Sequence, residues 1–554
     1  MKKYQIKLSS IIFLSIILIG FVLRFYNLDK NPPGLNWDEA SIGYNAYAIL
    51  KTGADEYGTR FPASIRSFDD YKPPLYVYLT IPSVALFGLN AFSVRFISAL
   101  LGSFAVIVMY GLTKESLLFS KNDRVSGIWD KLPIDQIALL SAFFLAISPW
   151  HLQFSRAAYE GNIGLFFCIL GTYLLLYAMR TGRGFVLSGI AYALTLYSYH
   201  SFRLIIPLFL VIISFIFYRP ILKLSKRYAL MAGIIVLAFI PVLVSLFSSA
   251  GTGSRLSMVT IFTGHDVLAP SIERIQYDQE HDYPFSEIFH NRRIVYGIAV
   301  LKGYLDHFDP QYLFISGDSG KHHHAVDMGM LYIVDVIFLI IGSVILTEKM
   351  TKRRLVLFAL FFVAPIASAI TTGTPHPVRA IAMVPVFHIL TAVGVVFVRR
   401  LSWLLMVCIS VLYMGNIAYY LHQYYVHTPV VYADFWQSEN EKLYTYLHSV
   451  EEEYDTLYVT YAYDQPYIYY LFFNKIDPQW YQNFWRTDGQ YVSDRFYKKV
   501  GKYEFRKMDG TIDLSGNKLL VTAAHEVPEG AHIINTIYFP DGTAAYVIST
   551  SIPQ

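Results

Sequence analysis

The stretch NPPGLNWDEASIGYNAYAIL, residues 31–50, decides how this chain is organised, because it places two adjacent carboxylates directly after a hydrophobic run. The Pro-Pro-Gly sequence at 32–34 ends the preceding helix. Asn36, followed three residues later by Glu39, has the spacing of a capping box that begins a new helix. We therefore expect Asp38 and Glu39 in the first turn of a short amphipathic helix, where the membrane meets water. The simplest role for the two acids is to complement the dipole of that helix, worth about 0.3–1 kcal/mol each.

The composition is that of a polytopic membrane protein. Of the 554 residues, 54% are hydrophobic and 16% are charged, whereas about a quarter of the residues in soluble domains are charged. The two cysteines, Cys168 and Cys408, both lie in apolar runs, so they indicate neither a disulfide framework nor a metal site. The sequence contains no phosphate-binding glycine loop, internal repeat or basic nucleic-acid patch, so no nucleic-acid partner is expected.

Hydropathy predicts eleven membrane spans. They lie near residues 8–25, 92–113, 134–150, 161–179, 184–199, 203–218, 228–248, 328–347, 355–371, 379–398 and 402–421. The basic segment 1–7 has no cleavage site after it, so we expect an uncleaved first span whose N-terminus is cytoplasmic. The run 74–89 is short and begins beside two prolines, and we expect it to form an interfacial or re-entrant helix.

Loop charges predict the orientation. One set of loops contains nineteen Lys and Arg against four Asp and Glu, an excess that is typical of the cytoplasmic side. These loops are residues 1–7, 114–131, 180–183, 219–227, 348–354 and 399–400. The other loops are then extracytoplasmic, and they include 26–91, 249–327 and everything after 422.

The expected architecture is a polytopic helical transmembrane domain, residues 1–425, followed by a small extracytoplasmic α/β domain, residues 426–554. The second segment has the composition of a soluble domain. Within it the sequence predicts a helix at 439–452, strands at 456–461 and 519–522, and a hairpin at 533–549 that turns at Asp541-Gly542.

Several polar side chains lie in loops on the predicted outer face. Lys72 precedes two prolines, which suits an ammonium that binds a lipid phosphate; the alternative is an ordinary interfacial lysine. His151, Arg156 and Glu160 are spaced by five and four residues, so we expect Arg156 and Glu160 on one helix face. They would form an ion pair there, or Glu160 would face a cavity at the start of a span.

Two tight outer turns are candidate anion-binding points, although a purely structural role is equally compatible with their sequences. His200 and Arg203 lie in the first, and His376 and Arg379 lie in the second. The long outer loop 249–327 contributes Arg255.

A histidine run and an acid inside a predicted span are further candidates for function. Residues 322–324 are three consecutive histidines, but consecutive residues cannot all face one tetrahedral ion, so we assign no metal ligand there. Asp335 lies inside a predicted span, about two turns from its outer end, where an acidic residue is expected to be functional or paired.

Taken together, these motifs resemble those of the C-type (GT-C) glycosyltransferases. The resemblance is carried by Asp-Glu at 38–39 after the first span, Lys-Pro-Pro-Leu at 72–75, and Ser-Arg at 155–156 before the acidic residue that opens a later span. Within this class the chain is similar to the lipid A aminoarabinose transferases and the protein O-mannosyltransferases, glycosyltransferase families 39 and 83, and the similarity in layout extends over nearly the whole chain.

The resemblance implies inverting transfer of a hexosyl or pentosyl group from a polyprenyl-phosphate donor to a hydroxyl of a lipid, glycan or protein, at the outer face of the plasma membrane. It implies that Asp38 is the catalytic acid/base residue. Lys72 and Arg255 would contact the donor phosphate, and Glu160 would be the second outer carboxylate, often Asp in the family. The candidate catalytic residues are thus Asp38, Glu39 and Glu160, and the candidate donor-phosphate or substrate ligands are Lys72, Arg255, Arg156, His200, Arg203, His376 and Arg379. The lipid-linked sugar is the one non-protein group implied, and a divalent metal is compatible with the chemistry.

A transporter and a receptor are the alternatives to a transferase. A lipid or sugar transporter would place ionisable residues near the bilayer midplane and show inverted repeats, whereas here the charges lie on one predicted face. A receptor that acts through its outer domain would leave the acids of the first loop and the Lys-Pro-Pro sequence without a role.

Overall fold

The computed structural model describes residues 8–118, 133–246, 259–263, 267–399, 402–487, 497–508 and 516–550. The chain divides into two compact units. The first contains residues 1–24, 101–154 and 159–420, and the second contains residues 25–100, 155–158 and 421–554.

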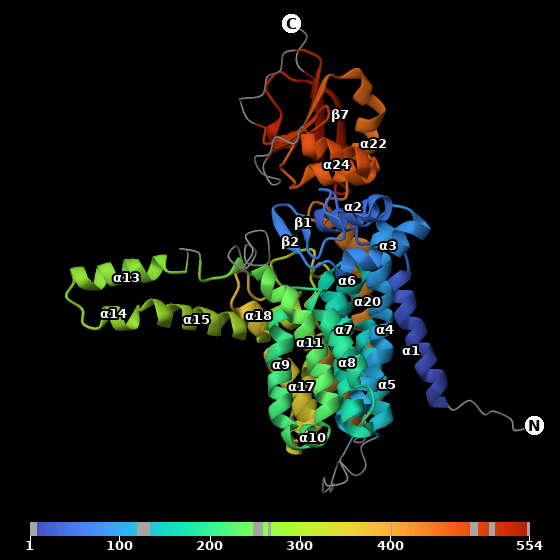
Figure 1. Ribbon diagram of the computed structural model, residues 1–554, viewed down its shortest axis with the longest axis vertical. Coiled ribbons are helices and arrows are strands. Elements are labelled where there is room, and N and C mark those ends of the chain that lie inside the picture. The colour runs from blue at the N-terminus through green and yellow to red at the C-terminus, as the bar shows by residue number, and fades with distance from the viewer. Residues whose placement is uncertain are drawn as a thin grey trace, which may run out of the picture. The chain divides into compact units, whose positions relative to one another are not determined.

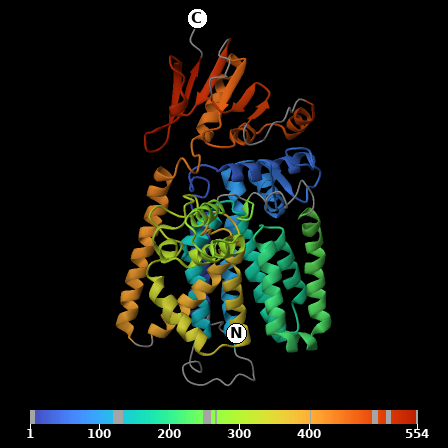
Figure 2. The same cartoon turned by 90° about the vertical axis from the view of Figure 1, so that its left-hand side faces the viewer.

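The first unit is built from apolar helices, and α7, α8, α9 and α11 run side by side in it (Figures 1 and 2). It contains all or most of the helices α1 (Leu8–Phe25), α4 (Ala91–Leu117), α5 (Ile134–Ile147), α6 (Pro149–Arg156), α7 (Glu160–Thr181), α8 (Phe185–Leu196), α9 (Phe202–Ile216), α10 (Tyr218–Lys223), α11 (Ser225–Leu246), α13 (Ala269–Glu280), α14 (Ser286–Phe289), α15 (Arg292–Leu305), α16 (Asp335–Glu348), α17 (Lys352–Val363), α18 (Ile366–Ala369), α19 (Val384–Arg399) and α20 (Trp403–His422). Short 3-10 or π turns occupy Asp306–Phe308, Tyr312–Ser316 and Ile381–Met383.

Within the described residues, six helices are long and apolar enough to cross a membrane. The number becomes seven if α5 and α6, bent by 53°, form one broken span. Each of the eleven predicted runs contains a helix, but several helices have only 12–15 residues, fewer than the roughly 17–25 that a span requires. The chain is a multi-pass membrane protein, and the count of eleven crossings stays a prediction. Helix α3 (Leu75–Phe87), in the run expected to be interfacial, has 13 residues.

Helices α16 and α19 approach each other closely because each has a glycine at the contact. A Cβ on Gly342 would lie 1.9 Å from the Leu390 carbonyl oxygen. A Cβ on Gly394 would lie 2.2 Å from the Phe338 carbonyl oxygen. Small residues allow this close packing between membrane helices.

Replacing Gly342 by Ala should therefore destabilise the first unit by about 1–3 kcal/mol, the usual cost of overpacking. The measurement is the unfolding temperature of the purified protein in one detergent. Gly233→Ala in α11 is the matched control, because no atom lies within 4 Å of its added Cβ. Equal unfolding temperatures for the two variants would contradict the tight α16–α19 contact.

The second unit contains a mixed six-stranded sheet with the order β4-β5-β3-β6-β8-β7. Strand β3 is parallel to β5 and β6, and the other pairs are antiparallel. The strands are β3 (Thr456–Thr460), β4 (Tyr497–Val500), β5 (Tyr503–Arg506), β6 (Lys518–Thr522), β7 (His532–Tyr538) and β8 (Ala544–Thr550). Helices α21 (Thr428–Val431), α22 (Asn440–Val450), α23 (Pro466–Phe473) and α24 (Pro478–Thr487) belong to the same unit, with short turns at Gln423–His427, Glu451–Glu453 and Ala524–Glu526.

The secondary structure predicted after residue 426 is confirmed. The helix is α22, the two strands are β3 and β6, and β7 and β8 form the hairpin. Gly542 in its turn has a φ of 87°, in the left-handed region that glycine enters without steric cost. The sequence did not predict β4, β5, α23 or α24.

The second unit also contains the first loop, with helices α2 (Trp37–Thr52) and α3 and a small hairpin of β1 (Ile65–Ser67) and β2 (Asp70–Lys72). Helix α2 packs against α3, α23 and α24. A helix here is confirmed, but the expected amphipathic character is wrong, because residues 39–46 are all buried and not only those on one face. The domain boundary at residue 425 stays a prediction.

Candidate functional site

The N-terminus of α2 is defined by a capping box, as predicted. The Asn36 side chain accepts a hydrogen bond from the Glu39 backbone N–H at 2.9 Å. The Glu39 carboxylate in turn accepts one from the Asn36 backbone N–H at 3.3 Å. This reciprocal pair satisfies two otherwise unpaired donors, and it places Asp38 in the first turn of the helix.

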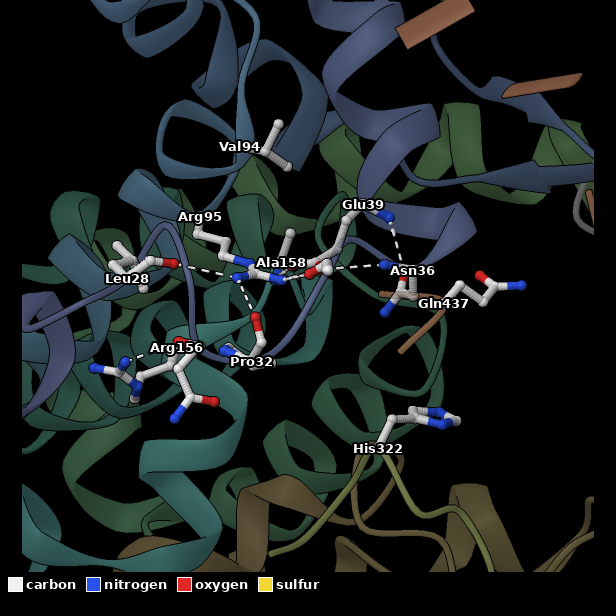
Figure 3. Close-up of polar contacts among 12 residues, drawn as sticks. Leu28, Pro32, Asn36, Glu39, Val94, Arg95, Arg156, Ala158, His322 and Gln437 are labelled. Carbon is white, nitrogen blue, oxygen red and sulfur yellow. Dashed lines mark hydrogen bonds and ion pairs between the residues drawn. The ribbon is translucent and has the colours of Figure 1, made fainter. Parts of the chain in front are cut away.

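Glu39 is buried and its carboxylate is fully engaged (Figure 3). Its side chain is 1% exposed. It forms an ion pair with Arg95, at 2.8 Å from Nη2 to Oε2 and 2.9 Å from Nε to Oε1, and it accepts the Ala158 backbone N–H at 2.9 Å. Arg95 also donates to the backbone carbonyls of Leu28, Pro32 and Gly34. The Glu39–Arg95 pair therefore holds the chain before α2 against the helix, and no substrate can reach this carboxylate without disrupting the pair.

Asp38 is in a different environment, because its side chain is 51% exposed and its Oδ1 forms an ion pair with Lys72 Nζ. Lys72 is the last residue of β2, and its side chain is 10% exposed. The β1–β2 turn has φ values of 56° and 59° at Phe68 and Asp69, the pattern of a type I′ hairpin turn. This hairpin sets the position of Lys72, whose Nζ lies 5.3 Å from the Phe68 ring centroid.

Asp38 and Lys72 together can perform two tasks that group transfer requires. A half-exposed carboxylate can accept a proton from a bound hydroxyl. An ammonium has three N–H donors, so Lys72 can contact a phosphate oxygen while it remains beside Asp38.

Arg156 is buried in the same unit, and its guanidinium donates to the protein. Its Nη2 donates to the carbonyls of Tyr26 and Asn31 at 2.8 Å each, and its Nε donates to the Tyr424 hydroxyl at 3.0 Å. The predicted shared helix face with Glu160 is wrong, because α6 ends at Arg156 and α7 begins at Glu160. The role of Arg156 as a substrate ligand stays a prediction, and its contacts indicate that it positions the segment before α2.

The other described candidates lie in the first unit, around the start of α7. A Cβ on Gly161 would lie 2.7 Å from the Val378 side chain, and a Cβ on Gly164 would lie 2.3 Å from the Phe202 ring. Both predicted turns therefore pack against the first turns of this helix. The candidates beside these contacts are Glu160, His200, Arg203, His376 and Arg379. Arg255 lies outside the described residues.

Each of these turns contains hydrogen bonds between neighbouring residues. His200 Nδ1 lies 3.1 Å from Arg203 Nη1, and Arg203 Nε donates to the Leu196 carbonyl at 3.1 Å. Arg379 Nη1 donates to the Thr371 hydroxyl at 2.6 Å and the Thr372 carbonyl at 2.8 Å.

His376 lies in a buried group of imidazoles. Its backbone N–H donates to His307 Nε2 at 3.1 Å, and its ring centroid lies 5.1 Å from that of His323. Burial lowers the pKa of His307 to about 4. Burial, followed by the charge of Arg379, lowers the pKa of His376 well below its usual value. Both imidazoles are therefore neutral at pH 7 and are not ready-made cationic ligands for a phosphate.

Two histidines of the run 322–324 contact nearby residues. His323 Nδ1 lies 2.7 Å from Asp318 Oδ2, and His324 contacts the carbonyl oxygens of Asp318 and Ala325. Across the residues that the structure describes, no group of three or more His, Cys, Asp or Glu side chains could hold a metal ion.

Asp335 is not two turns inside a span, because α16 begins at this residue. Its carboxylate accepts the Tyr332 backbone N–H at 3.2 Å and the Tyr413 hydroxyl at 2.5 Å. The expectation of a paired acid is correct, and the predicted depth is wrong because the seven preceding residues of the run are not helical.

Sequence reasoning missed Arg95, which connects Glu39 to the chain before α2. A signal was present, because Arg95 is the one charged residue of the predicted span 92–113. Ionisable residues in such positions usually pair with a partner inside the protein.

Comparison with known proteins confirms the resemblance to the GT-C class. Residues 14–250 match the family of dolichyl-phosphate-mannose-protein mannosyltransferases. ArnT from Cupriavidus metallidurans, solved with undecaprenyl phosphate, is 12% identical, with a TM-score of 0.51 over 98% of this chain and 99% of that protein. No curated protein sequence matches the chain.

Two other structures are similar over smaller shares of their length. The Archaeoglobus fulgidus oligosaccharyltransferase is 16% identical, with a TM-score of 0.47 over 86% of this chain. The chain spans 64% of the length of that archaeal protein. The S. cerevisiae protein O-mannosyltransferase complex Pmt1–Pmt2 is 18% identical, with a TM-score of 0.32 over 44% of this chain and 34% of that chain.

The class of protein that follows is a multi-pass membrane protein with the GT-C fold. Within this class, the fold of the whole chain is similar to that of ArnT, and residues 14–250 are similar in sequence to the dolichyl-phosphate-mannose-protein mannosyltransferases.

Proposed function

We propose that the chain is an inverting glycosyltransferase that moves a sugar from a polyprenyl-phosphate donor to a hydroxyl of a lipid, glycan or protein. The observation that carries the proposal is the contrast between two adjacent acids. Asp38 is half-exposed beside Lys72, whereas Glu39 is buried against Arg95. One carboxylate is open to a substrate next to a cation, and its neighbour supports the helix that presents it.

In the proposed reaction, Asp38 accepts the proton of the acceptor hydroxyl as the oxygen attacks the anomeric carbon. The bond between that carbon and the phosphate oxygen breaks, and its electron pair leaves with the polyprenyl phosphate. Attack from the face opposite the phosphate inverts the anomeric configuration. Lys72 stabilises the negative charge that develops on the leaving phosphate, which is the role that fixed cations play in group transfer. For Arg255 the proposed role is a second phosphate contact, and for Glu160 it is that of a second catalytic carboxylate.

The proposed location of this chemistry is the outer face of the plasma membrane, with a cytoplasmic N-terminus. Support comes from the nineteen-to-four excess of basic residues in the proposed cytoplasmic loops. Single cysteines at Ser225 and Ser449, both exposed, should be labelled by an impermeant maleimide from opposite sides of sealed vesicles. The exposed Cys408 is first replaced by Ser. Labelling of both positions from one side would overturn the orientation.

Lys72→Ala should lower donor turnover by a factor of about ten to a hundred, because a hydrogen bond to a charged group contributes about 1.5–3 kcal/mol and the charge on the phosphate rises during the reaction. The protein should remain folded, since Asp38 is half-exposed and water can solvate it. The measurement is donor turnover together with the unfolding temperature, and Arg66→Ala is the control, a partly exposed cation of the same hairpin paired with Asp69. Unchanged turnover in a Lys72→Ala, Arg255→Ala double variant would reject the phosphate assignment.

The proposed activity itself is tested by incubating the purified protein in nanodiscs with a panel of polyprenyl-phosphate sugars and an extract of cell-envelope lipids, glycans and proteins. Mass spectrometry should detect free polyprenyl phosphate and a glycosylated acceptor with one of the donors. Movement of the intact donor across vesicles without cleavage would indicate a transporter instead.

A further inference from the structure

The helices α13, α14 and α15 of the first unit form an arm that projects from the helical bundle (Figure 1). Figure 2 shows the same arm almost end-on, so its helices run across the direction of the bundle helices in both views. The proposed reaction uses no residue of this arm. The surface of the arm nevertheless exposes a row of apolar side chains and two arginines.

One face of α15 is apolar and exposed. Ile294, Ile298, Leu301 and Leu305 recur at intervals of four, three and four residues, which places them in one stripe along the helix. Their exposed fractions lie between 41% and 62%. Ile288 and Phe289 of α14 are also exposed, at 57% and 66%. Proteins rarely expose a contiguous apolar surface of this kind to water.

The base of the arm contacts the end of a bundle helix. The Tyr304 hydroxyl donates to the Phe362 carbonyl at 3.0 Å, and the rings of Phe308 and Phe361 lie 5.6 Å apart. Gly303 permits a close approach, because a Cβ there would lie 3.2 Å from the Ala369 carbonyl oxygen. Phe362 is itself 51% exposed on α17. The apolar stripe of α15 therefore ends beside an exposed apolar residue of the bundle, Phe362.

Two arginines lie at the N-terminal end of α15. Arg292 and Arg293 line an open pocket of about 650 Å³ together with Phe262, Tyr296, Gly297 and Val300. In the part of the chain that the structure describes, neither guanidinium forms an ion pair. Two adjacent guanidinium groups beside an apolar stripe are complementary to lipid phosphates, which lie directly above the acyl chains.

We propose that the arm is a membrane-surface element, in which the apolar stripe of α14 and α15 is inserted into the lipid interface and Arg292 and Arg293 lie at the level of the lipid phosphates. Three features favour lipid over a protein partner. These are the crosswise direction of α15, the exposed Phe362 beside its base, and two arginines that form no ion pair with the described residues. An interfacial helix of this kind buries its apolar face about 5–10 Å into the boundary between headgroups and acyl chains.

The test is the accessibility of nitroxide labels in nanodiscs of phosphatidylethanolamine and phosphatidylglycerol. Labels are attached to single cysteines at Ile298 and Leu301 in the full chain with Cys408→Ser. Two controls are labels at Val411, an exposed apolar position of α20, and at Thr445, an exposed position of α22. Molecular oxygen concentrates in lipid, whereas a polar nickel chelate remains in water.

The proposal expects both arm labels to collide more often with oxygen than with the nickel chelate. The Val411 label should show the same preference for oxygen, and the Thr445 label should show the opposite preference. Arm labels that resemble the Thr445 label would show that the stripe faces water, which overturns the proposal. Arm labels that neither reagent reaches would show that protein covers the stripe, which also overturns it. All four sites are surface positions, and an unchanged unfolding temperature verifies that each labelled protein is folded.

Discussion

Asp38→Asn should reduce sugar transfer by a factor of about a hundred to ten thousand, the usual contribution of a positioned general base, and should leave the unfolding temperature nearly unchanged. Asparagine keeps the size of the side chain and removes the carboxylate that accepts the proton. The stability cost should be small, because the amide oxygen of asparagine can still accept a hydrogen bond from Lys72, whose side chain is 10% exposed, and position 38 itself is half-exposed. The measurements are transfer rate and thermal unfolding on the same preparation.

Comparison of Asp38 with Glu39 and Glu160 shows which of the three carboxylates is the general base. Glu39→Gln and Glu160→Gln are the matched variants, because each removes one negative charge near the start of a helix. Near-normal transfer by Asp38→Asn, with loss of transfer in one of the other two, would reassign the base to that residue. Activity in all three variants would remove the main physical support for the transferase proposal.

Glu39→Gln should show the opposite behaviour, with a large loss of stability and a small effect on transfer by the molecules that remain folded. Gln retains the reach that the capping box requires, so the cap alone would predict a loss of no more than about 1 kcal/mol. The structure predicts more, because the change leaves the buried guanidinium of Arg95 without its counter-ion. Breaking a buried ion pair in this way costs about 3–5 kcal/mol.

The measurement for Glu39→Gln is the unfolding temperature in detergent, with transfer normalised to the folded fraction. Glu39→Gln combined with Arg95→Met removes both charges and should recover part of the lost stability, since replacing a buried pair by apolar groups is often neutral. A Glu39→Gln protein as stable as the wild type would show that the Arg95 pair contributes little. Normal stability with no transfer would give Glu39 a catalytic role.

Local features of the site could be predicted because neighbouring residues determine them. The capping box at Asn36 and Glu39 follows from their spacing, and the Asp541-Gly542 turn follows from its own dipeptide. The apolar runs also predicted where helices occur. Their exact ends were less predictable, as the start of α16 at Asp335 shows.

Contacts between distant segments could not be predicted from local pattern. Glu39 and Arg95 are 56 residues apart, and Asp38 and Lys72 are 34 apart. The two acids are adjacent and chemically similar, so only the folded structure distinguishes the buried one from the half-exposed one. The grouping of the first loop with the C-terminal segment likewise depends on contacts such as the hydrogen bond from the Tyr44 hydroxyl to the Ile476 carbonyl.

The most direct test of the central proposal measures free polyprenyl phosphate released per folded molecule by the wild type and by Asp38→Asn, side by side in the same nanodiscs with donor and acceptor. The account predicts release by the wild type and at least a hundredfold less by Asp38→Asn, with equal donor binding by both. Equal release by the two proteins would contradict the account.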